Sequence, residues 1–251
     1  MDHREMVINN FGQTAANYRK SAIHGNAEKL AHMVSLLEPK SHFSGLDIAT
    51  GAGHTALALA PMVNRVAAID ITEQMLAQAR AEAAARCLAN IDFIIDDVHN
   101  ISFTDNSFDV VTCRYAAHHF SDICSAINEM SRVLKPGGQL YILDCTVVGD
   151  EETQAVVNQA EILRDNSHIC LYSENAWGKM LSKAGFRVEY SVVTRTEYEL
   201  PLWFDTIATP AENRVQVFQE LARLSQEGRE DYQFSANYIT SYEIELLAIL
   251  N

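Results

Sequence analysis

The sequence predicts an α/β fold: a doubly wound, mostly parallel sheet of seven strands, with helices on both faces and a helical cap. Three observations support this prediction. Short apolar runs alternate with helical segments between residues 45 and 144, two glycines follow the first apolar run, and a Lys-Pro-Gly-Gly turn (135–138) separates a helix from the next strand. Such alternation is typical of parallel sheets, whose strands are joined by crossover helices.

Each expected strand is a short apolar run bounded by turn-forming residues. The seven expected strands cover residues 45–49, 66–71, 91–96, 108–114, 139–144, 186–196 and 242–250. Helices are expected where apolar residues recur every three or four positions. In the core they cover residues 55–62, 73–88, 122–133 and 174–184.

Further helical segments flank and interrupt this alternation. Residues 1–40 predict two helices, and the second covers 26–37 and ends before Pro39. Residues 151–164 and 210–224 predict helices that form, with the N-terminal pair, a cap over the carboxyl edge of the sheet. No linker rich in Pro, Gly or Ser divides the chain, so we expect one domain over 1–251. Its parts are N-terminal lid helices (1–40), a core (41–145), and cap insertions with the C-terminal strands (146–251).

Composition limits the partners of the protein. A net charge of −14 argues against nucleic acids and anionic membranes, because phosphate groups need a basic face. The five cysteines show no C-x-x-C spacing, so we expect free thiols, a reducing compartment and no structural zinc. No apolar segment is long enough for a signal peptide or a membrane span. We therefore expect a cytoplasmic protein with a small-molecule substrate, and the sequence is compatible with a homodimer.

The first predicted strand leads into a nucleotide-binding turn. Asp47 lies in that strand, Gly51 and Gly53 follow it, and a helical run begins directly after them. Glycine lets a backbone approach a ligand closely. Residues 51–56 match G-x-G-x-x-A, and Asp70 at the end of the second strand is suitably placed to bind ribose hydroxyls. These features fit a nicotinamide or flavin dinucleotide and S-adenosylmethionine equally well.

Acids in the first strand and at the end of the third strand favour S-adenosylmethionine. Asp47 would repel a pyrophosphate, whereas it would attract the ammonium group of an amino acid. At the end of the third strand, Asp96 and Asp97 offer an acceptor for the exocyclic amine of adenine, and motif register favours Asp97.

Ordered motifs over residues 40–145 resemble the class I S-adenosylmethionine-dependent methyltransferases, and most closely their small-molecule branch with the ubiquinone/menaquinone-type enzymes. They are the glycine turn, Asp70, the 96–98 acids, Ser-Phe-Asp-Val-Val (107–111) and Arg-Val-Leu-Lys-Pro-Gly-Gly (132–138). The resemblance implies a Rossmann-like fold and S-adenosyl-L-methionine as cofactor. It also implies roles for cofactor-binding residues: Asp47, Gly51 and Gly53 at the methionine portion, Asp70 at the ribose, and Ile71, Asp97 and Val98 at the adenine.

One residue departs from the family pattern. Ala49 stands where the family has the first of its alternating glycines, and we expect it to line the cofactor site all the same. Alanine is plausible there if its backbone does not adopt a positive φ.

The acceptor side is expected in the loop after the fourth strand, which contains Arg114, His118 and His119. Either histidine is a candidate general base, and adjacent side chains diverge, so at most one should face the acceptor. The alternative is that they pack or cap the next helix, with Ser121 or Asp122 as its N-cap. Arg114 is expected against the cofactor or a carboxylate of the cap.

Other candidates lie outside that loop. Tyr18 either closes over the methionine end of the cofactor or packs on the core, and His168 either reaches the acceptor or lies in a surface turn. Aromatic residues of the C-terminal third either form an apolar acceptor pocket or are ordinary core: Tyr190, Tyr198, Trp203, Phe204 and Phe218. The scattered histidines show no metal-ligand spacing, so no metal is expected.

The expected activity is transfer of a methyl group from S-adenosylmethionine to an O or C atom of a small, apolar or aromatic metabolite. The alternative from the same fold is an S-adenosylmethionine-binding protein that promotes another reaction, such as a cyclisation. A non-enzymatic binding module would need a degraded cofactor site, and a nicotinamide oxidoreductase would bind NAD(H) instead.

Overall fold

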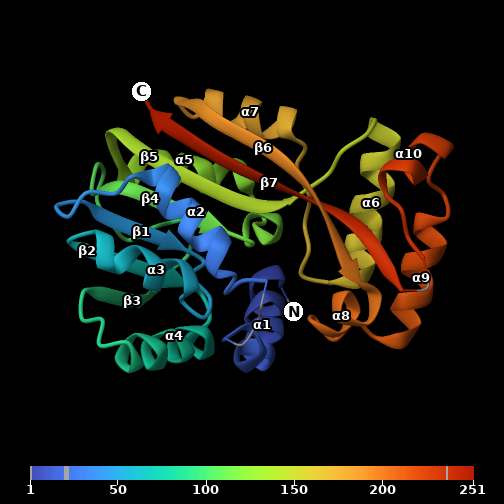
Figure 1. The fold of residues 1–251 in the computed structure, drawn as a ribbon, viewed down its shortest axis with the longest axis horizontal. Coiled ribbons are helices and arrows are strands. Elements are labelled where there is room, and N and C mark those ends of the chain that lie inside the picture. Colours follow the sequence, from blue (N-terminus) through green and yellow to red (C-terminus); the bar gives the residue numbers. More distant parts are fainter. Residues whose placement is uncertain (1, 20–22, 236) are drawn as a thin grey trace.

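The computed structural model describes residues 2–19, 23–235 and 237–251. Its centre is a seven-stranded sheet in the order β3-β2-β1-β4-β5-β7-β6, which confirms the predicted fold class (Figure 1). The strands are β1 (Ser44–Ile48), β2 (Arg65–Asp70), β3 (Ile91–Ile95), β4 (Phe108–Arg114), β5 (Leu134–Thr146), β6 (Phe186–Glu199) and β7 (Tyr238–Leu250). Strands β1 to β5 pair in parallel, whereas β7 runs antiparallel to both β5 and β6.

The order of the strands reverses beside β1, which is flanked by β2 on one side and β4 on the other. In doubly wound sheets, ligands bind at such a switch point, outside the carboxyl ends of the strands. A ligand-binding site is therefore expected at the loops that follow β1, β2, β3 and β4.

The predicted turn at 135–138 lies inside the first part of β5. Leu134 pairs with Phe108 before this turn, and Gln139 pairs with Val110 after it. Gly137 has a φ of 77°, a left-handed backbone conformation that residues with a Cβ rarely adopt. The turn is thus a bulge that interrupts the ladder between β4 and β5.

Helices surround the sheet on both faces (Figure 1). Their bounds are α1 (His3–Arg19), α2 (Ala27–Leu37), α3 (His54–Leu59), α4 (Glu73–Ala85), α5 (Ile123–Val133), α6 (Glu151–Arg164), α7 (Glu174–Lys183), α8 (Leu200–Asp205), α9 (Ala211–Leu221) and α10 (Gln226–Asp231). Short 3₁₀ turns cover Ala60–Met62 and Ala117–His119. Of the two N-cap candidates for α5, Asp122 holds that position, and its side chain accepts a hydrogen bond from the Ser125 N–H.

Strand β2 shows why both faces of the sheet are covered. Ala67 and Ile69 contribute to one core cluster with α5 and α7, whereas Val66 and Ala68 contribute to a second cluster with α2 and α3. A strand buried on both faces needs apolar residues at consecutive positions. This requirement explains the continuous apolar runs in the sequence.

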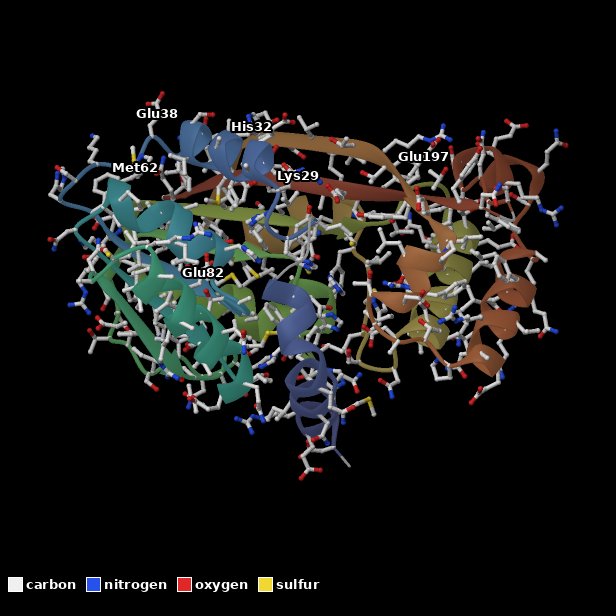
Figure 2. The ribbon with its side chains drawn as sticks, turned by 60° about the horizontal axis from the view of Figure 1, so that its bottom comes forward. Lys29, His32, Glu38, Met62, Glu82 and Glu197 are labelled. Carbon is white, nitrogen blue, oxygen red and sulfur yellow. The ribbon has the colours of Figure 1, made fainter. Side chains whose placement is uncertain are left out.

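The cap has a core of its own. Strands β6 and β7 continue past the other strands and carry α6, α8, α9 and α10 at their far end (Figure 1). Trp203, Phe204 and Val217 belong to this third cluster, and Phe218 packs against it. Helix α1 packs on α4 and lies between the core and the cap in both views (Figures 1 and 2). Over the described ranges, no helix combines the length and apolar character that a bilayer crossing requires.

Candidate functional site

A cavity of about 400 Å³ lies at the carboxyl ends of the parallel strands. This volume is within the range of small-molecule sites, about 300–1,000 Å³. Its walls come from the glycine loop after β1, the end of β2, the loops after β3 and β4, and α1. Nine predicted cofactor residues line it: Tyr18, Asp47, Ala49, Gly51, Asp70, Ile71, Asp97, Val98 and Arg114. The tenth, Gly53, is absent from this wall.

Gly51 and Gly53 serve different purposes in the loop. Gly51 has a φ of 53°, and a Cβ built there would meet nothing within 4 Å, so the loop stays open toward the cavity. Gly53 has a φ of 88°, and a Cβ there would lie 2.8 Å from the Cβ of Ala79 on α4. Gly53 therefore allows the loop to pass close to α4, and Gly51 leaves the surface of the cavity open.

Ala49 adopts a φ of 49°, so the condition under which alanine was plausible at this position is not met. Left-handed backbone costs an L-residue about 1–2 kcal/mol. The loop therefore holds an alanine in a left-handed backbone conformation. The surrounding contacts, such as the Thr50 N–H donating to the Ile69 carbonyl at 2.9 Å, hold the loop in place.

Asp47 is buried, and its carboxylate accepts three hydrogen bonds. It accepts hydrogen bonds from the hydroxyls of Thr50 (2.6 Å) and Thr112 (2.8 Å) and from the N–H of Ala56 (3.2 Å). Burial raises the pKa of Asp47 to about 6, although these bonds and Arg114 oppose the rise. A cationic ligand beside this group would stabilise its ionised form.

Asp70 joins the glycine loop to the loop after β2. It accepts hydrogen bonds from the N–H groups of Gly51 (2.8 Å) and Thr72 (2.9 Å). Burial raises the pKa of Asp70, and these bonds oppose the effect. The carboxylate thus lines the cavity and connects the two loops.

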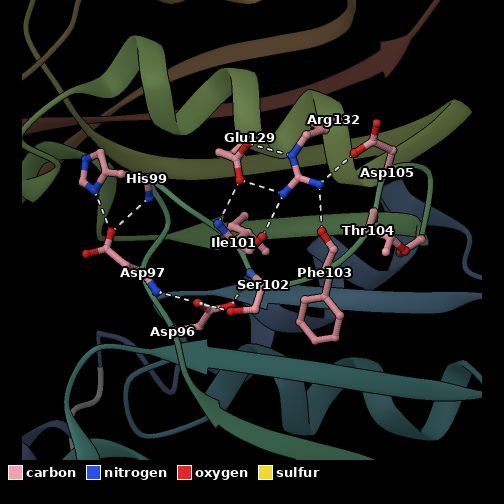
Figure 3. A network of polar contacts seen from close by, with 11 residues as sticks. Asp96, Asp97, His99, Ile101, Ser102, Phe103, Thr104, Asp105, Glu129 and Arg132 are labelled. Carbon is pink, nitrogen blue, oxygen red and sulfur yellow. Dashed lines mark hydrogen bonds and ion pairs between the residues drawn. The ribbon is translucent and has the colours of Figure 1, made fainter.

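The two acids after β3 point to different partners (Figure 3). Asp96 accepts hydrogen bonds from the N–H and hydroxyl of Ser102. Asp97 accepts from the N–H of His99 (3.0 Å), lies 2.7 Å from its Nδ1, and accepts from Arg4 of α1 (3.3 Å). Burial acts to raise the pKa of Asp97, but His99 and Arg4 outweigh it and lower the pKa. Asp97 therefore presents an ionised acceptor at this end of the cavity.

Behind these acids, an ion-pair network fixes the loop between β3 and β4 (Figure 3). Arg132 binds both oxygens of Glu129 and donates to the carbonyls of Ile101 and Phe103. It also pairs with Asp105 at 2.9 Å. The motif residue Arg132 thus has a structural role in supporting the loop that carries Asp97.

Arg114 lies at the opposite end of the cavity and keeps unused donors. Its Nη1 donates to the Thr55 hydroxyl (3.2 Å) and, weakly, to the His24 carbonyl (3.4 Å). Its Nε and Nη2 are buried and have no hydrogen-bond partner within the described chain. A buried cation with free donors fits an anionic group of a ligand, because its desolvation is otherwise uncompensated.

A second cavity, of about 80 Å³, lies between the core and the cap. Four of its residues also line the first cavity: Tyr18, His24, Tyr115 and His119. His118, Tyr198 and Trp203 line the second cavity alone, together with charged side chains of α6 and its C-terminal end. These charged residues are Glu161, Arg164 and Asp165. Two ligands bound in the two cavities would therefore meet at the shared residues.

His118 forms a pair with Asp144 at the end of β5. The ring Nδ1 lies 2.5 Å from one carboxylate oxygen of Asp144, and the backbone N–H of His118 donates to the other at 3.0 Å. Burial acts to lower the pKa of His118, but the charge and hydrogen bond of Asp144 outweigh burial and raise the pKa. Because Nδ1 faces Asp144, Nε2 is the nitrogen available to a substrate.

His119 has a different environment. Its Nδ1 lies 2.9 Å from the Ser167 carbonyl, and its ring packs edge-on against Phe11. Burial and the neighbouring His118 lower the pKa of His119 to about 4. The two rings lie 4.1 Å apart and both line the second cavity. The tight 3₁₀ turn at Ala117–His119 brings the consecutive rings together.

Some of the remaining candidates lie at the second cavity, and others pack in the cap core or elsewhere on the sheet. His168 is buried, its ring lies 5.5 Å from His118, and burial lowers its pKa, so it is no surface residue. Phe204 and Phe218 pack in the cap core, and Tyr190 contacts His32 and Glu245 on another part of the sheet. The predicted aromatic pocket is thus reduced to Tyr198 and Trp203, and its wall includes charged groups.

In the part of the chain that the structure describes, one group of potential metal ligands comes together: His118, Asp144 and Cys145. The 2.5 Å between the first two ligand atoms is a hydrogen-bond distance. Atoms that share a metal at about 2.0–2.2 Å each would lie farther apart in a tetrahedral site. This arrangement fits a histidine–carboxylate pair better than a metal centre.

Two carboxylates that support the site were not predicted from the sequence. Asp144 ends an apolar strand in the same way as Asp47 and Asp70, so its position was a usable signal. Glu243 of β7 offered none: it is buried and accepts from the hydroxyls of Tyr115 (3.1 Å) and Tyr198 (3.0 Å) and from Lys29. Only the pairing of β7 in the sheet brings it to these partners.

Comparisons with known proteins identify the family and the relatives of the chain. Residues 39–185 match a family model described as a methyltransferase domain. The uncharacterized methyltransferase YcgJ of Bacillus subtilis is 33% identical over 231 residues, which cover 90% of each chain. Its crystal structure aligns with a TM-score of 0.83 at 30% identity, over 89% of this chain and 98% of that one.

Two further matches bear on the fold and on the cofactor half. The crystal structure of a putative methyltransferase from Bacillus halodurans C-125 aligns with a TM-score of 0.84 at 30% identity, over 89% of this chain and 99% of that one. A demethylmenaquinone methyltransferase of Staphylococcus epidermidis is 34% identical over 116 residues, which cover 45% of this chain and 47% of that enzyme.

Proposed function

Since the chain belongs to the methyltransferase domain family, we propose that it transfers the methyl group of S-adenosyl-L-methionine to an O or C atom of a small molecule bound in the second cavity. The observation that supports this proposal most strongly is that the two cavities share Tyr18, His24, Tyr115 and His119. A donor in the larger cavity and an acceptor in the smaller one would be adjacent at these residues. Methyl transfer requires this alignment of the two reactants.

In this proposal the donor spans the larger cavity from Asp97 to Arg114. Asp97 accepts the exocyclic amine of adenine beside Val98 and Ile71, and Asp70 accepts the ribose hydroxyls. Asp47 faces the ammonium group of the methionine portion, whose positive charge would stabilise the ionised form that burial disfavours. The free Nε and Nη2 of Arg114 bind the carboxylate.

The order of these groups matches the charge pattern of the ligand. Acids meet the amine, the hydroxyls and the ammonium group, and Arg114, a buried cation with free donors, meets the carboxylate. A dinucleotide would instead place its pyrophosphate near Asp47 and Asp70, two buried carboxylates, which Coulomb repulsion disfavours.

The proposed chemistry needs little from the protein beyond alignment and proton transfer, because a sulfonium methyl group is already electrophilic. His118 takes the proton of the acceptor on Nε2, while Asp144 holds the ring through Nδ1 and stabilises its protonated form. His119, with a pKa of about 4, stays neutral at pH 7 and packs beside the methyl group. His118 is thus the better of the two candidate bases.

The walls of the second cavity favour a small aromatic acceptor with polar substituents. Tyr198 and Trp203 supply ring faces, and Glu161, Arg164 and Asp165 supply charge. Arg164 pairs with Glu161 at 2.7 Å and lies over the Trp203 ring. A wholly apolar acceptor would remove water from these charged groups without offering them a hydrogen bond. In this division, helix α1 closes the site, residues 41–145 hold the donor and contribute His118 and His119 to the acceptor side, and residues 146–251 supply much of the remaining acceptor wall.

Ligand-induced thermal stabilisation tests the donor half of the proposal. S-adenosylhomocysteine is expected to raise the melting temperature, Asp70→Ala to weaken that rise, and NAD(H) to have no effect. Stabilisation by NAD(H) alone would overturn the assignment of the donor.

Label transfer tests the acceptor half. Donor labelled in its methyl group is incubated with a panel of small hydroxylated aromatic compounds and with wild-type or His118→Gln protein. Label in an organic product, reduced by His118→Gln, supports the proposal. Conversion of an acceptor while all label stays on the donor would instead establish a reaction such as a cyclisation.

A further inference from the structure

Glu243 of β7 is a buried carboxylate that binds the hydroxyls of two tyrosines. One of its oxygens accepts hydrogen bonds from Tyr115 (3.1 Å) and Tyr198 (3.0 Å), and the other binds the ammonium group of Lys29 on α2. Lys29 also donates to the Tyr115 hydroxyl at 3.0 Å. The lysine thus compensates the charge of the carboxylate, and both tyrosines are tied to it.

The Glu243 carboxylate lies at the wall of the second cavity. Ser241, two residues earlier on β7, and Cys145, the partner of Glu243 on β5, both line this cavity, as does Tyr198. Side chains two residues apart on a strand, and those of directly paired residues, share one face of a sheet. Tyr198 pairs with Ile239, so its ring extends along β7 past Ser241 to bring its hydroxyl to Glu243. This hydroxyl therefore lies at the same wall as the carboxylate.

The hydrogen bonds to Glu243 fix the direction in which Tyr198 can bond a ligand. A phenol hydroxyl has one proton to donate and lone pairs with which to accept. A carboxylate that is paired with Lys29 only accepts, so the Tyr198 proton points to Glu243. Burial raises the pKa of Tyr198 above its ordinary value, so the hydroxyl keeps this proton. Tyr198 therefore offers the cavity a hydrogen-bond acceptor and no donor.

We propose that Glu243 is a positioning residue that makes the second cavity select an aromatic acceptor with two hydroxyl groups. This inference rests on the proposed function. The oxygen of one hydroxyl bonds to the methyl carbon as the sulfonium C–S bond breaks, the electron pair of that bond stays on sulfur, and the hydroxyl proton goes to Nε2 of His118. The second hydroxyl donates a hydrogen bond to the Tyr198 oxygen. A methoxy group in its place would bring two oxygens together without a proton between them, and the wall disfavours it.

Glu243→Gln is expected to reverse the direction of these hydrogen bonds. The amide oxygen has to face the Lys29 ammonium group, because the amide nitrogen offers only protons. The amide nitrogen then faces the tyrosines and donates to their oxygens, which frees the Tyr198 proton for the cavity. The variant is therefore expected to gain affinity for a methoxy oxygen and to lose its preference for a hydroxyl group.

Ligand-observed NMR titration of protein saturated with S-adenosylhomocysteine measures this preference. The probes are the three isomers of dihydroxybenzene and the three corresponding methoxyphenols. Wild type is expected to bind at least one dihydroxybenzene about 5- to 30-fold more tightly than its methoxyphenol, the effect of leaving one acceptor without a donor. In Glu243→Gln this ratio of affinities is expected to fall by at least the same factor.

Tyr198→Phe tests the same contact with less change to the protein, because it keeps the ring and leaves the Glu243 ion pair in place. It removes the acceptor oxygen without creating a donor, so its ratio should lie between those of wild type and Glu243→Gln. Lost packing alone would weaken both probes of a pair equally, so the ratio separates packing from hydrogen bonding.

Glu245→Gln is the matched control on the same strand. Glu245 also accepts from two tyrosine hydroxyls, those of Tyr141 (2.6 Å) and Tyr190 (3.4 Å). His32, on the same helix as Lys29 (Figure 2), lies 3.2 Å from it. Neither of these tyrosines belongs to the described walls of the two cavities, so this variant is expected to keep the wild-type ratio.

The possible failures are distinguishable. A wild-type ratio in Glu243→Gln or in Tyr198→Phe, or an equal fall in Glu245→Gln, would overturn the role of Glu243. Wild type that binds S-adenosylhomocysteine but prefers no dihydroxybenzene over its methoxyphenol would overturn the selection of two hydroxyls and leave the donor assignment intact. Failure of wild type to bind S-adenosylhomocysteine would overturn the proposed function itself.

Discussion

Replacing Asp47 by Asn is expected to stabilise the ligand-free protein at neutral pH and to weaken donor binding. Asp47 is buried, and its carboxylate accepts hydrogen bonds from Thr50, Thr112 and Ala56. An Asn side chain fits the same space: its oxygen accepts from the Thr50 hydroxyl and the Ala56 N–H, and its amide donates to the Thr112 hydroxyl. The variant thus keeps the hydrogen bonds and removes a buried charge.

The magnitude follows from the pKa of Asp47, which burial raises from 3.8 to about 6. One pKa unit corresponds to 1.36 kcal/mol, so ionisation of Asp47 in the folded state costs up to about 3 kcal/mol relative to the unfolded state. At about 2 °C per kcal/mol for a chain of this size, the variant should melt about 6 °C higher at pH 8.

The gain depends on pH in a defined direction. The pKa of Asp47 is higher in the folded state, so its contribution to stability is complete below 3.8 and is lost as the pH rises through about 6. Asn does not ionise. The advantage of Asp47→Asn is therefore expected to be small at pH 4, to grow between pH 4 and 6, and to level off above pH 7.

Donor binding should change in the opposite sense. A hydrogen bond to a charged group contributes about 1.5–3 kcal/mol, so loss of the ammonium partner should weaken S-adenosylhomocysteine binding by about 10- to 150-fold. Denaturant unfolding at pH 4.5, 6 and 8 and calorimetric titration measure the two effects. Asp92→Asn, at an exposed carboxylate outside the cavity, is the matched control. A variant less stable than wild type at pH 8, or a gain independent of pH, would refute the reasoning.

Three other substitutions test separate parts of the site. Ala49→Gly relieves the left-handed backbone at φ 49°, and after the entropy cost of glycine it should stabilise the protein by about 0.5 kcal/mol; calorimetry that finds a lower Tm would contradict the assigned strain. Arg114→Leu removes two buried donors without partners, so ligand-free stability should hold while S-adenosylhomocysteine affinity falls about 10- to 150-fold; unchanged affinity would exclude Arg114 from the carboxylate site. Asp144→Asn removes the charge that raises the pKa of His118, and NMR titration should show a lower pKa for that ring; an unshifted titration would show that Asp144 does not tune His118.

The sheet was predictable because its strands are buried on both faces. Such strands need consecutive apolar residues, and β2 shows them in the run from Val66 to Ile69. The far ends of β6 and β7 were not predictable in the same way. Residues 197–199 of β6 alternate between exposed and half-buried positions and pair with β7 up to Tyr238, so their strand conformation depends on the partner strand.

The short helix α8 was missed for a related reason. Its six residues contain Pro201 and four large apolar side chains, which show no helical period over so short a length. Leu200, Trp203 and Phe204 pack into the cap core, and this packing stabilises the helix. Tertiary contacts rather than local propensity determine the segment.

The walls of the larger cavity were predictable and those of the smaller cavity were not, because the two are built differently. Asp47, Asp70 and Asp97 each lie near or just after the end of a strand of the parallel sheet, so local sequence places them at the same edge. The walls of the smaller cavity combine Asp165 after α6 with Tyr198 of β6 and His118 after β4, which only the packing of the cap on the core brings together. Relatives that share the local pattern can therefore share the donor and differ in the acceptor.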